Sequence, residues 1–286
     1  MTQRGVPNSR RAAKGAAPGA RPPVMVYKEV KGLTKGLEIL KVLNRYPGGL
    51  AFVTELAAAC SLHRTTAKRL LETLRLNNLV RRGELEGSYC LTFEVKGLSE
   101  GFHDDEWVER VASPKMRAAV PSLLWWCDLC TLSGSWMVVR ESTHRWSNLA
   151  QERAMVGQRM PVLTTSAGRA WLTWSPRPER EALLGLISAS RTDETRAQAS
   201  DRTAVSRMVA ATRRRGYSIN AGEWSLYPHI SAVAVPVFCE DRLIAVLSLG
   251  FPTDAVSPSA LKQRFLPSLL GLAAVIGKES RCWFVP

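Results

Sequence analysis

The chain has 286 residues, a formal net charge of +14, 45% hydrophobic residues and 22% charged residues, the balance of a globular protein with about two domains. Its best apolar run, residues 266–276, has about half the length that a membrane-spanning helix needs, and the basic N-terminus lacks the apolar stretch of a signal peptide. We therefore expect neither a membrane partner nor secretion, and a cytoplasmic location instead.

Positive charge is concentrated at one end of the chain. Residues 1–98 carry 17 basic and 7 acidic side chains, whereas all nine tryptophans lie after residue 98. This asymmetry indicates two parts with two tasks, of which the basic part faces a polyanion. Nucleic acid is the first candidate, and an anionic membrane surface is the alternative.

The six cysteines form no disulfide framework for a chain of this size, which fits a reducing compartment. Cys127 and Cys130 make a C-x-x-C motif, but they lie in a predicted strand, where positions three apart point to opposite faces. They therefore cannot share a metal, and no second C-x-x-C completes a zinc site. We predict buried structural thiols, and we expect neither a metal nor a cofactor.

Residues 1–29 are predicted to be a disordered basic tail, because Arg, Ala, Gly and Pro dominate and large apolar groups are scarce. A first helix follows from Val30, with leucines at helical spacing, and Pro47-Gly48-Gly49 ends it. A second helix runs from Thr54, as N-cap, to Ala59. After a short turn at residues 60–63, a third helix covers residues 64–76.

The third helix has two distinct faces. With about 100° per residue, Ala67, Leu70, Leu71 and Leu74 form an apolar stripe, and the opposite face is mostly basic, with hydroxyl groups and one acid. A helix, a short turn and an amphipathic helix with a basic outer face place a recognition helix in the DNA major groove. A charged face alone is common on surface helices, but it does not explain the preceding turn or the regional charge.

Two short strands, residues 79–82 and 88–92, flank a loop bounded by Gly83 and Gly87, which predicts a β-hairpin. Directly after a helix-turn-helix, such a hairpin is a wing. Arg81 and Arg82 are then placed to reach the phosphate backbone. Residues 30–92 are therefore predicted to be a winged helix-turn-helix DNA-binding domain.

Residues 93–104 are predicted to be a linker helix, and residues 105–286 an α+β domain with an antiparallel sheet backed by helices. A helix from Asp105 leads into it. Its predicted strands are residues 127–132, 136–141, 230–238 and 243–250, and its predicted helices are residues 166–174, 178–187, 201–215 and 257–279.

Three segments, Gly32–Leu40, Leu62–Leu74 and Ile230–Val237, resemble the bacterial transcription factors of the IclR (isocitrate lyase regulator) type. More narrowly, residues 98–102, 139–145 and 153–161 resemble members that regulate hydroxyphenylpropionate catabolism. The resemblance implies a winged-helix DNA reader joined to a GAF/PAS-like effector domain, assembled as homodimers or homotetramers. It implies a small organic acid as effector, often an aromatic one, control of a catabolic operon with a lean toward activation, and RNA polymerase as a candidate partner.

Two sets of site residues follow. For double-stranded DNA we assign Arg64, Thr65, Lys68 and Arg69 to the groove or its phosphates, with Arg81 and Arg82 on the wing. For the effector, Thr164, Thr165 and Ser166 open a helix whose free N–H groups suit a carboxylate, although a simple N-cap explains them equally well. The resemblance adds Asn220, Ser231 and Ser248, with Trp125, Trp136, Trp146 and Trp171 as candidate pocket walls.

The sequence contains none of the common enzyme motifs tested: G-x-S-x-G, G-x-x-x-x-G-K, H-E-x-x-H or G-x-G-x-x-G. We therefore predict no catalytic residues. Two alternatives stay open. One is a GAF-type thiol redox sensor or reductase that uses Cys127, Cys130 or Cys239, and the other is a ligand-independent repressor or architectural DNA-binding protein.

Overall fold

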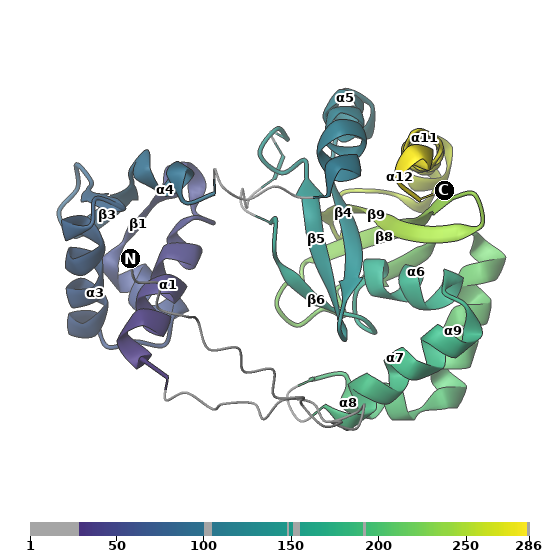
Figure 1. The fold of residues 1–286 in the computed structure, drawn as a ribbon, viewed down its shortest axis with the longest axis horizontal. Helices are drawn as coiled ribbons and strands as arrows, with labels where there is room; N and C mark the ends of the chain where they lie inside the picture. The colour runs from purple at the N-terminus through teal and green to yellow at the C-terminus, as the bar shows by residue number, and fades with distance from the viewer. Residues whose placement is uncertain (1–28, 100–104, 148, 151–154, 191–192, 285–286) are drawn as a thin grey trace, which may run out of the picture.

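The computed structural model describes residues 29–99, 105–147, 149–150, 155–190 and 193–284. They form two units, each with its own buried cluster of apolar side chains (Figure 1). The predicted tail, apart from Glu29, and residues 100–104 of the predicted linker lie outside these ranges. No helix within the described ranges combines the length and apolar character needed to cross a membrane.

The N-terminal unit consists of three helices and a small antiparallel sheet. The helices are α1 (Lys31–Leu43), α2 (Val53–Ala59) and α3 (Arg64–Leu76), and a short 3-10 turn covers Pro47–Gly49. The sheet has the order β1 (Leu50–Phe52), β3 (Ser88–Leu91), β2 (Val80–Arg82). The predicted third helix and the wing hairpin are confirmed, and β1, too short to show a pattern in the sequence, adds a third strand.

Helix α1 buries a face somewhat different from the row of leucines that predicted it. Its buried residues are Gly36, Ile39, Leu40 and Leu43. Leu33 and Leu37 are exposed, at 63% and 47%. Their spacing correctly indicated a helix, but contact with α2 and α3 selects the buried stripe.

Thr54 is not the N-cap of the second helix, because α2 begins one residue earlier, at Val53. Phe52 occupies the cap position, and its N–H donates to Glu55 Oε2 at 2.7 Å. The glutamate therefore satisfies the backbone donor without a capping hydroxyl.

The predicted linker helix is wrong for the described residues beyond Gly97. Only α4 (Glu94–Gly97) is helical, and residues 98–99 form a turn. Gly97 has a low helix propensity, about 1 kcal/mol below alanine, and one helical turn has too few hydrogen bonds to offset it.

A six-stranded antiparallel sheet forms the middle of the C-terminal unit. Its order is β6 (Arg159–Pro161), β5 (Trp136–Ser142), β4 (Trp126–Ser133), β9 (Arg242–Pro252), β8 (Ile230–Cys239), β7 (Ser218–Ala221). The four predicted strands are confirmed as β4, β5, β8 and β9. The short edge strands β6 and β7 were not predicted.

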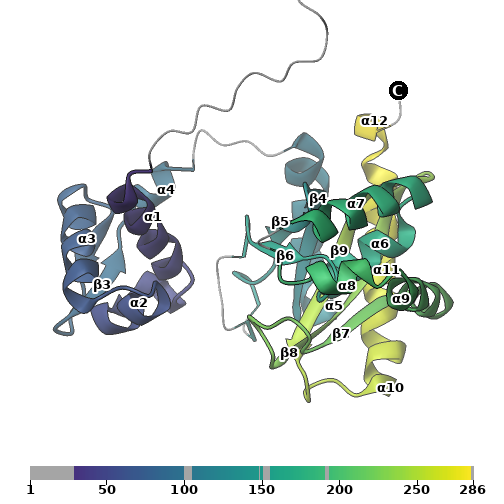
Figure 2. The same cartoon turned by 90° about the horizontal axis from the view of Figure 1, so that it is seen from below.

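Helices cover both faces of this sheet (Figures 1 and 2). One face carries a π-helical turn, Val108–Ala112, that leads into α5 (Ser113–Leu123), together with the C-terminal helices α10 (Pro258–Ala260), α11 (Leu266–Glu279) and α12 (Arg281–Phe284). The other face carries α6 (Ser166–Trp174), α7 (Arg177–Ala189), α8 (Arg196–Ser200) and α9 (Arg202–Arg215). The final helix, predicted as continuous from residue 257, is interrupted by a π-helical turn at Leu261–Phe265.

Strand alternation divides the side chains between the two faces. On β8, Val233, Val235 and Val237 enter the core beneath α5 and α11, whereas Ala234 faces α6. On β4, Cys127 lies in the core beneath α5 and α11, and Cys130 lies in the core beneath α6. The prediction that these two thiols lie on opposite faces is therefore confirmed.

Gly168, in the first turn of α6, lets this helix approach the chain before it. A Cβ at this position would overlap the backbone of Val162. We expect Gly168→Ala to lower the free energy of unfolding by about 2 kcal/mol, the usual cost of overpacking, as measured by urea denaturation.

Gly185 in α7 is the matched control, because a Cβ there meets nothing within 4 Å. Gly185→Ala should stabilise the protein by about 0.5–1 kcal/mol. Equal effects of the two substitutions would contradict the close approach of α6.

Candidate functional site

The basic face of α3 points away from the core of the N-terminal unit. Arg64, Thr65, Lys68 and Arg69 are all exposed. On the opposite side of the helix, Ala67 and Leu71 are completely buried. The four residues predicted to face DNA are thus held outward together.

His63 sits directly before α3 and fixes its start. Its Nδ1 accepts from the Thr65 N–H at 3.4 Å and lies 2.8 Å from Thr65 Oγ1. Since the N–H donates to Nδ1, the network assigns the ring proton to Nε2. No sequence pattern indicates this capping role, because histidine is not among the preferred N-cap residues.

The single acid of this helix, Glu72, joins α3 to the wing. One carboxylate oxygen accepts from Tyr89 Oη at 2.6 Å and Arg82 Nη2 at 3.0 Å, and the other accepts from Arg75 Nε at 2.8 Å. Hydrogen bonds from Tyr89 and Arg75 are the main causes that lower the pKa of Glu72 to about 2.

Arg82, which is predicted to contact phosphate, belongs to this cluster. Its guanidinium pairs with Glu72, because strand β2 runs alongside α3. Arg81 is exposed, and its Nη1 donates to the carbonyl of Arg82 at 3.4 Å. Arg82 therefore connects the wing to α3, and the phosphate contacts of Arg81 and Arg82 both stay predictions.

The C-terminal unit contains a cavity of about 330 Å³ on the sheet face that carries α6. It is bounded by the start of β4, the end of β9, the start of β8, and the segment between β7 and β8. The lining residues are Trp126, Asp128, His144, Met155, Met160, Thr165, Ser166, Ala167, Asn220, Trp224, Leu226, Tyr227, His229, Ile230, Ala232, Ser248 and Gly250.

The N-terminus of α6 opens into this cavity. Thr165 caps the helix by accepting from the Gly168 N–H at 3.2 Å. The N–H groups of Ser166 and Ala167, at the first two helical positions, have no partner within the helix. Thr165 therefore satisfies one donor of the helix start and leaves two others at the cavity.

Hydroxyl and amide groups surround this helix start. Ser166 Oγ lies 3.0 Å from Ser248 Oγ on β9. Asn220 Nδ2 donates to the carbonyl of Thr164 at 2.9 Å. Of the six predicted effector residues, Thr165, Ser166, Asn220 and Ser248 line the cavity. Thr164 is not among the lining residues, although it is buried.

Ser231 does not line this cavity. It lies on the opposite face of β8 from Ala232, and its hydroxyl donates to Thr253 Oγ1 at 3.1 Å. Its strand borders the cavity, but a shift of one residue along a strand reverses the face on which a side chain lies.

The tryptophans predicted as effector-pocket walls do not line this cavity. Trp125, Trp136, Trp146 and Trp171 are absent from the lining, and the indoles present are those of Trp126 and Trp224. Tyr227 adds a third ring, edge-on to Trp224 with centroids 4.8 Å apart. The alternation of side chains along β4 could have identified Trp126, because it lies on the same face of the strand as Asp128.

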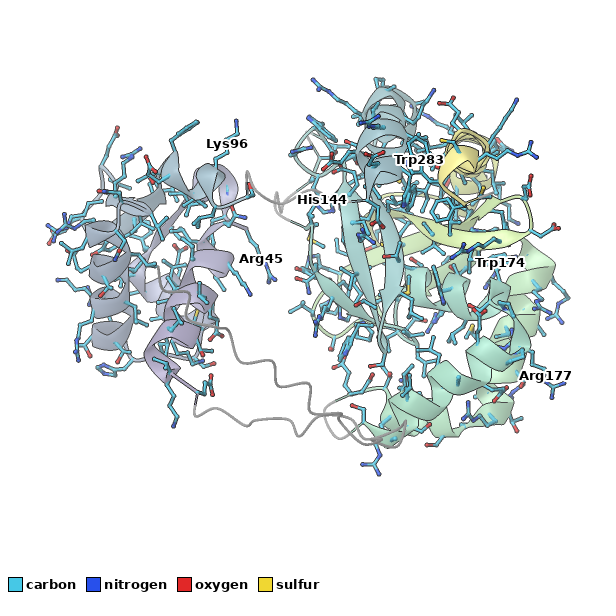
Figure 3. The ribbon with its side chains drawn as sticks, viewed as in Figure 1. Arg45, Lys96, His144, Trp174, Arg177 and Trp283 are labelled. Carbon is cyan, nitrogen blue, oxygen red and sulfur yellow. The ribbon has the colours of Figure 1, made fainter. Side chains whose placement is uncertain are left out.

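Sequence reasoning missed a polar cluster at this cavity, in which Ser142 supports the lining residues Asp128 and His144. Ser142 Oγ donates to Asp128 Oδ1 at 2.6 Å, and His144 Nε2 lies 3.7 Å from the same oxygen. His144, labelled in Figure 3, lies just beyond the end of strand β5 at Ser142. The cavity thus holds one carboxylate and an imidazole beside it.

The three thiols considered for redox chemistry are all buried. Burial raises the pKa values of Cys127 and Cys130 well above the usual range and also raises that of Cys239. The reactive thiolate is therefore disfavoured at each position. The described residues also contain no group of three or more His, Cys, Asp or Glu placed to hold a metal.

Two family models match successive parts of the chain. The IclR helix-turn-helix domain matches residues 32–84, and the bacterial transcriptional regulator IclR C-terminal domain matches residues 105–277. The chain belongs to the IclR family. It is a DNA-binding transcriptional regulator with an effector-binding domain, as the sequence resemblance predicted, and the matched domains and relatives are regulators, not enzymes.

Individual relatives are distant. The acetate operon repressor of Salmonella typhimurium is 26% identical over 257 residues, which span 86% of this chain and 88% of that protein. The IclR structure from Thermotoga maritima has a TM-score of 0.55 and 16% identity, covering 88% of this chain and all of that one. An IclR homologue from Microbacterium hydrocarbonoxydans, complexed with 4-hydroxybenzoate, has a TM-score of 0.53 and 20% identity, covering 88% and 99%.

Glu72 makes the stability of the N-terminal unit depend on pH in a defined direction. Its pKa of about 2 lies below the ordinary 4.5, so its contribution is present above about pH 4.5 and is lost as the pH falls toward 2. Glu72→Gln should be less stable than the wild type near neutral pH. The difference should shrink below about pH 4.5, as measured by urea unfolding followed by circular dichroism.

Glu86→Gln is the control, because Glu86 lies in the exposed wing loop and makes no ion pair among the described residues. A constant difference between wild type and Glu72→Gln down to about pH 2 would contradict the role of the carboxylate.

Proposed function

We propose that the effector of this IclR-family regulator is a small aromatic acid, bound with its carboxylate at the start of α6 and its ring among Trp126, Trp224 and Tyr227. The observation that carries this proposal is the position of the N-terminus of α6 at one end of an aromatic cavity. Free N–H groups and the helix dipole favour an anion there. The volume of about 330 Å³ is at the small end of ligand cavities.

Asp128 restricts which acids fit. Its Cα pairs with that of Ser248 in the β4–β9 register, so its carboxylate is close to the proposed anion position. A second carboxylate nearby requires positive charge to offset the repulsion. The helix N-terminus supplies part of it, and His144 supplies more when protonated.

The solved homologue that contains 4-hydroxybenzoate provides a precedent in a protein of this fold. For this chain we retain the predicted control of a catabolic operon. The resemblance to hydroxyphenylpropionate regulators favours activation, whereas the Salmonella relative is named a repressor. In vitro transcription with RNA polymerase, with and without the effector, decides between them.

On DNA, we assign residues 30–92 to operator binding and residues 105–286 to effector binding. A single winged helix makes few base contacts, so we propose that a homodimer or homotetramer reads half-sites about one helical turn, or a multiple of it, apart. The free positive charges of α3 predict that affinity falls steeply with salt concentration. The cytoplasmic location belongs to this proposal as well.

Two arginines on α3 provide the test of the division into two functions. The double variant that combines Arg64→Ala and Arg69→Ala should abolish specific DNase footprints on the promoter beside the gene, since both side chains are exposed on the basic face. The same variant should retain thermal stabilisation by effector acids, measured by scanning calorimetry with a panel of benzoates and phenylpropionates.

Arg207→Ala with Arg214→Ala, on exposed positions of α9, is the charge-matched control and should leave the footprint intact. Loss of both DNA and ligand responses in a folded Arg64/Arg69 variant would contradict the division. A footprint that no acid changes would favour the ligand-independent alternative.

Two serines test the cavity itself. Ser248→Ala removes a hydroxyl at the start of α6 and should weaken binding of the effector acid by about tenfold, the effect of one hydrogen bond to a charged group. Ser231→Ala is the matched control, because its side chain faces the other side of β8. Isothermal titration calorimetry measures both, and equal effects would exclude the proposed cavity.

A further inference from the structure

A second hollow lies at the other end of α6. Its volume is about 720 Å³, and it is bounded by the β4–β5 hairpin, the end of α6, the start of α7, the end of α9 and the β8–β9 turn. It shares no lining residue with the effector cavity. Trp171, one of the predicted effector-pocket walls, and Trp174 contribute half-buried indoles to it. Trp174 and Arg177 are labelled in Figure 3.

Two arginines meet at the last carbonyls of α6. Arg213 donates to the carbonyl of Thr173 from both Nε and Nη2, at 3.2 and 3.0 Å. Arg180 Nη1 donates to the carbonyl of Leu172 at 3.0 Å and lies 3.5 Å from that of Thr173. Two guanidinium groups thus lie next to one another on neutral acceptors.

Neither arginine has a carboxylate within 4.0 Å in the part of the chain that the structure describes. Burial and the charge of Arg213 lower the pKa of Arg180. The arrangement therefore holds like charges together, which costs free energy that a bound anion would offset.

The remaining charged groups of the hollow leave it positive. It contains five arginines and three carboxylates, namely Arg140, Arg177, Arg180, Arg213, Arg242, Asp105, Glu179 and Asp241. Arg140 is paired with Asp105 at 3.1 Å, and the Arg242 guanidinium lies over the Phe284 ring. Beyond that pair the hollow contains four arginines and two carboxylates, and Arg180 and Arg213 are the two arginines that meet at the end of α6, on the helix that carries the two indoles.

We propose that this hollow is a second ligand site, which takes a small aromatic oxyanion. The anionic group bridges Arg180 and Arg213, because guanidinium groups bind planar oxyanions through paired hydrogen bonds. The aromatic ring lies against Trp171 and Trp174. This site is independent of the proposed effector cavity, since the two lie at opposite ends of a nine-residue helix about 13 Å long.

The experiment is a titration of the full chain with benzoate, in which calorimetry and tryptophan fluorescence measure binding. Arg213→Gln should weaken one class of benzoate sites by at least about tenfold. Arg214→Gln, which removes the same charge from the next residue of α9 but does not line the hollow, should leave that class unchanged. Cyclohexanecarboxylate, of equal charge but without an aromatic ring, should bind this class more weakly than benzoate.

Ser248→Ala separates this proposal from that of the effector cavity, since it should weaken only the other class of sites. If thermal melting shows that the Arg213→Gln variant is not folded, the Arg180→Gln and Trp174→Leu variants provide the same test. Benzoate binding that is equal in the Arg213→Gln and Arg214→Gln variants would overturn the proposal. A single class of sites, lost in Ser248→Ala, would overturn it too.

Discussion

The close approach of α6 to the chain that precedes it is the constraint on which the C-terminal unit depends. Gly168 permits this contact, because any side chain at that position would overlap the backbone of Val162. With the helix in this position, its N-terminal donors face the cavity, and its C-terminal carbonyls face the arginines of the second hollow. One short helix therefore presents opposite ends of its dipole to two different environments.

In the N-terminal unit, a single carboxylate pairs with part of the basic surface. Glu72 engages Arg75 and Arg82 and leaves Arg64, Lys68 and Arg69 on the exposed face without an ion pair among the described residues. The basic surface is therefore divided into arginines paired with Glu72 and the cations that our proposal assigns to DNA. Net charge alone could not show this division, because it counts both kinds equally.

The effector cavity combines groups of opposite preference. Its helix N-terminus favours an anion, but Asp128 opposes one, and the two lie on neighbouring elements. Under the proposed function, selectivity among acids comes from how well a ligand places its charge toward the helix and away from the carboxylate.

The sequence by itself determined the helix-turn-helix, the wing and the main strands, because each depends on local periodicity, turn residues or charge, and its resemblance to known regulators indicated the family. It also predicted four lining residues of the cavity and the opposite faces of Cys127 and Cys130. Only the tertiary structure decided that Ser231 faces away, that Trp126 replaces the predicted tryptophans, and that Arg82 pairs with Glu72. These features depend on strand register and on contacts between residues far apart in the chain, which local patterns do not encode.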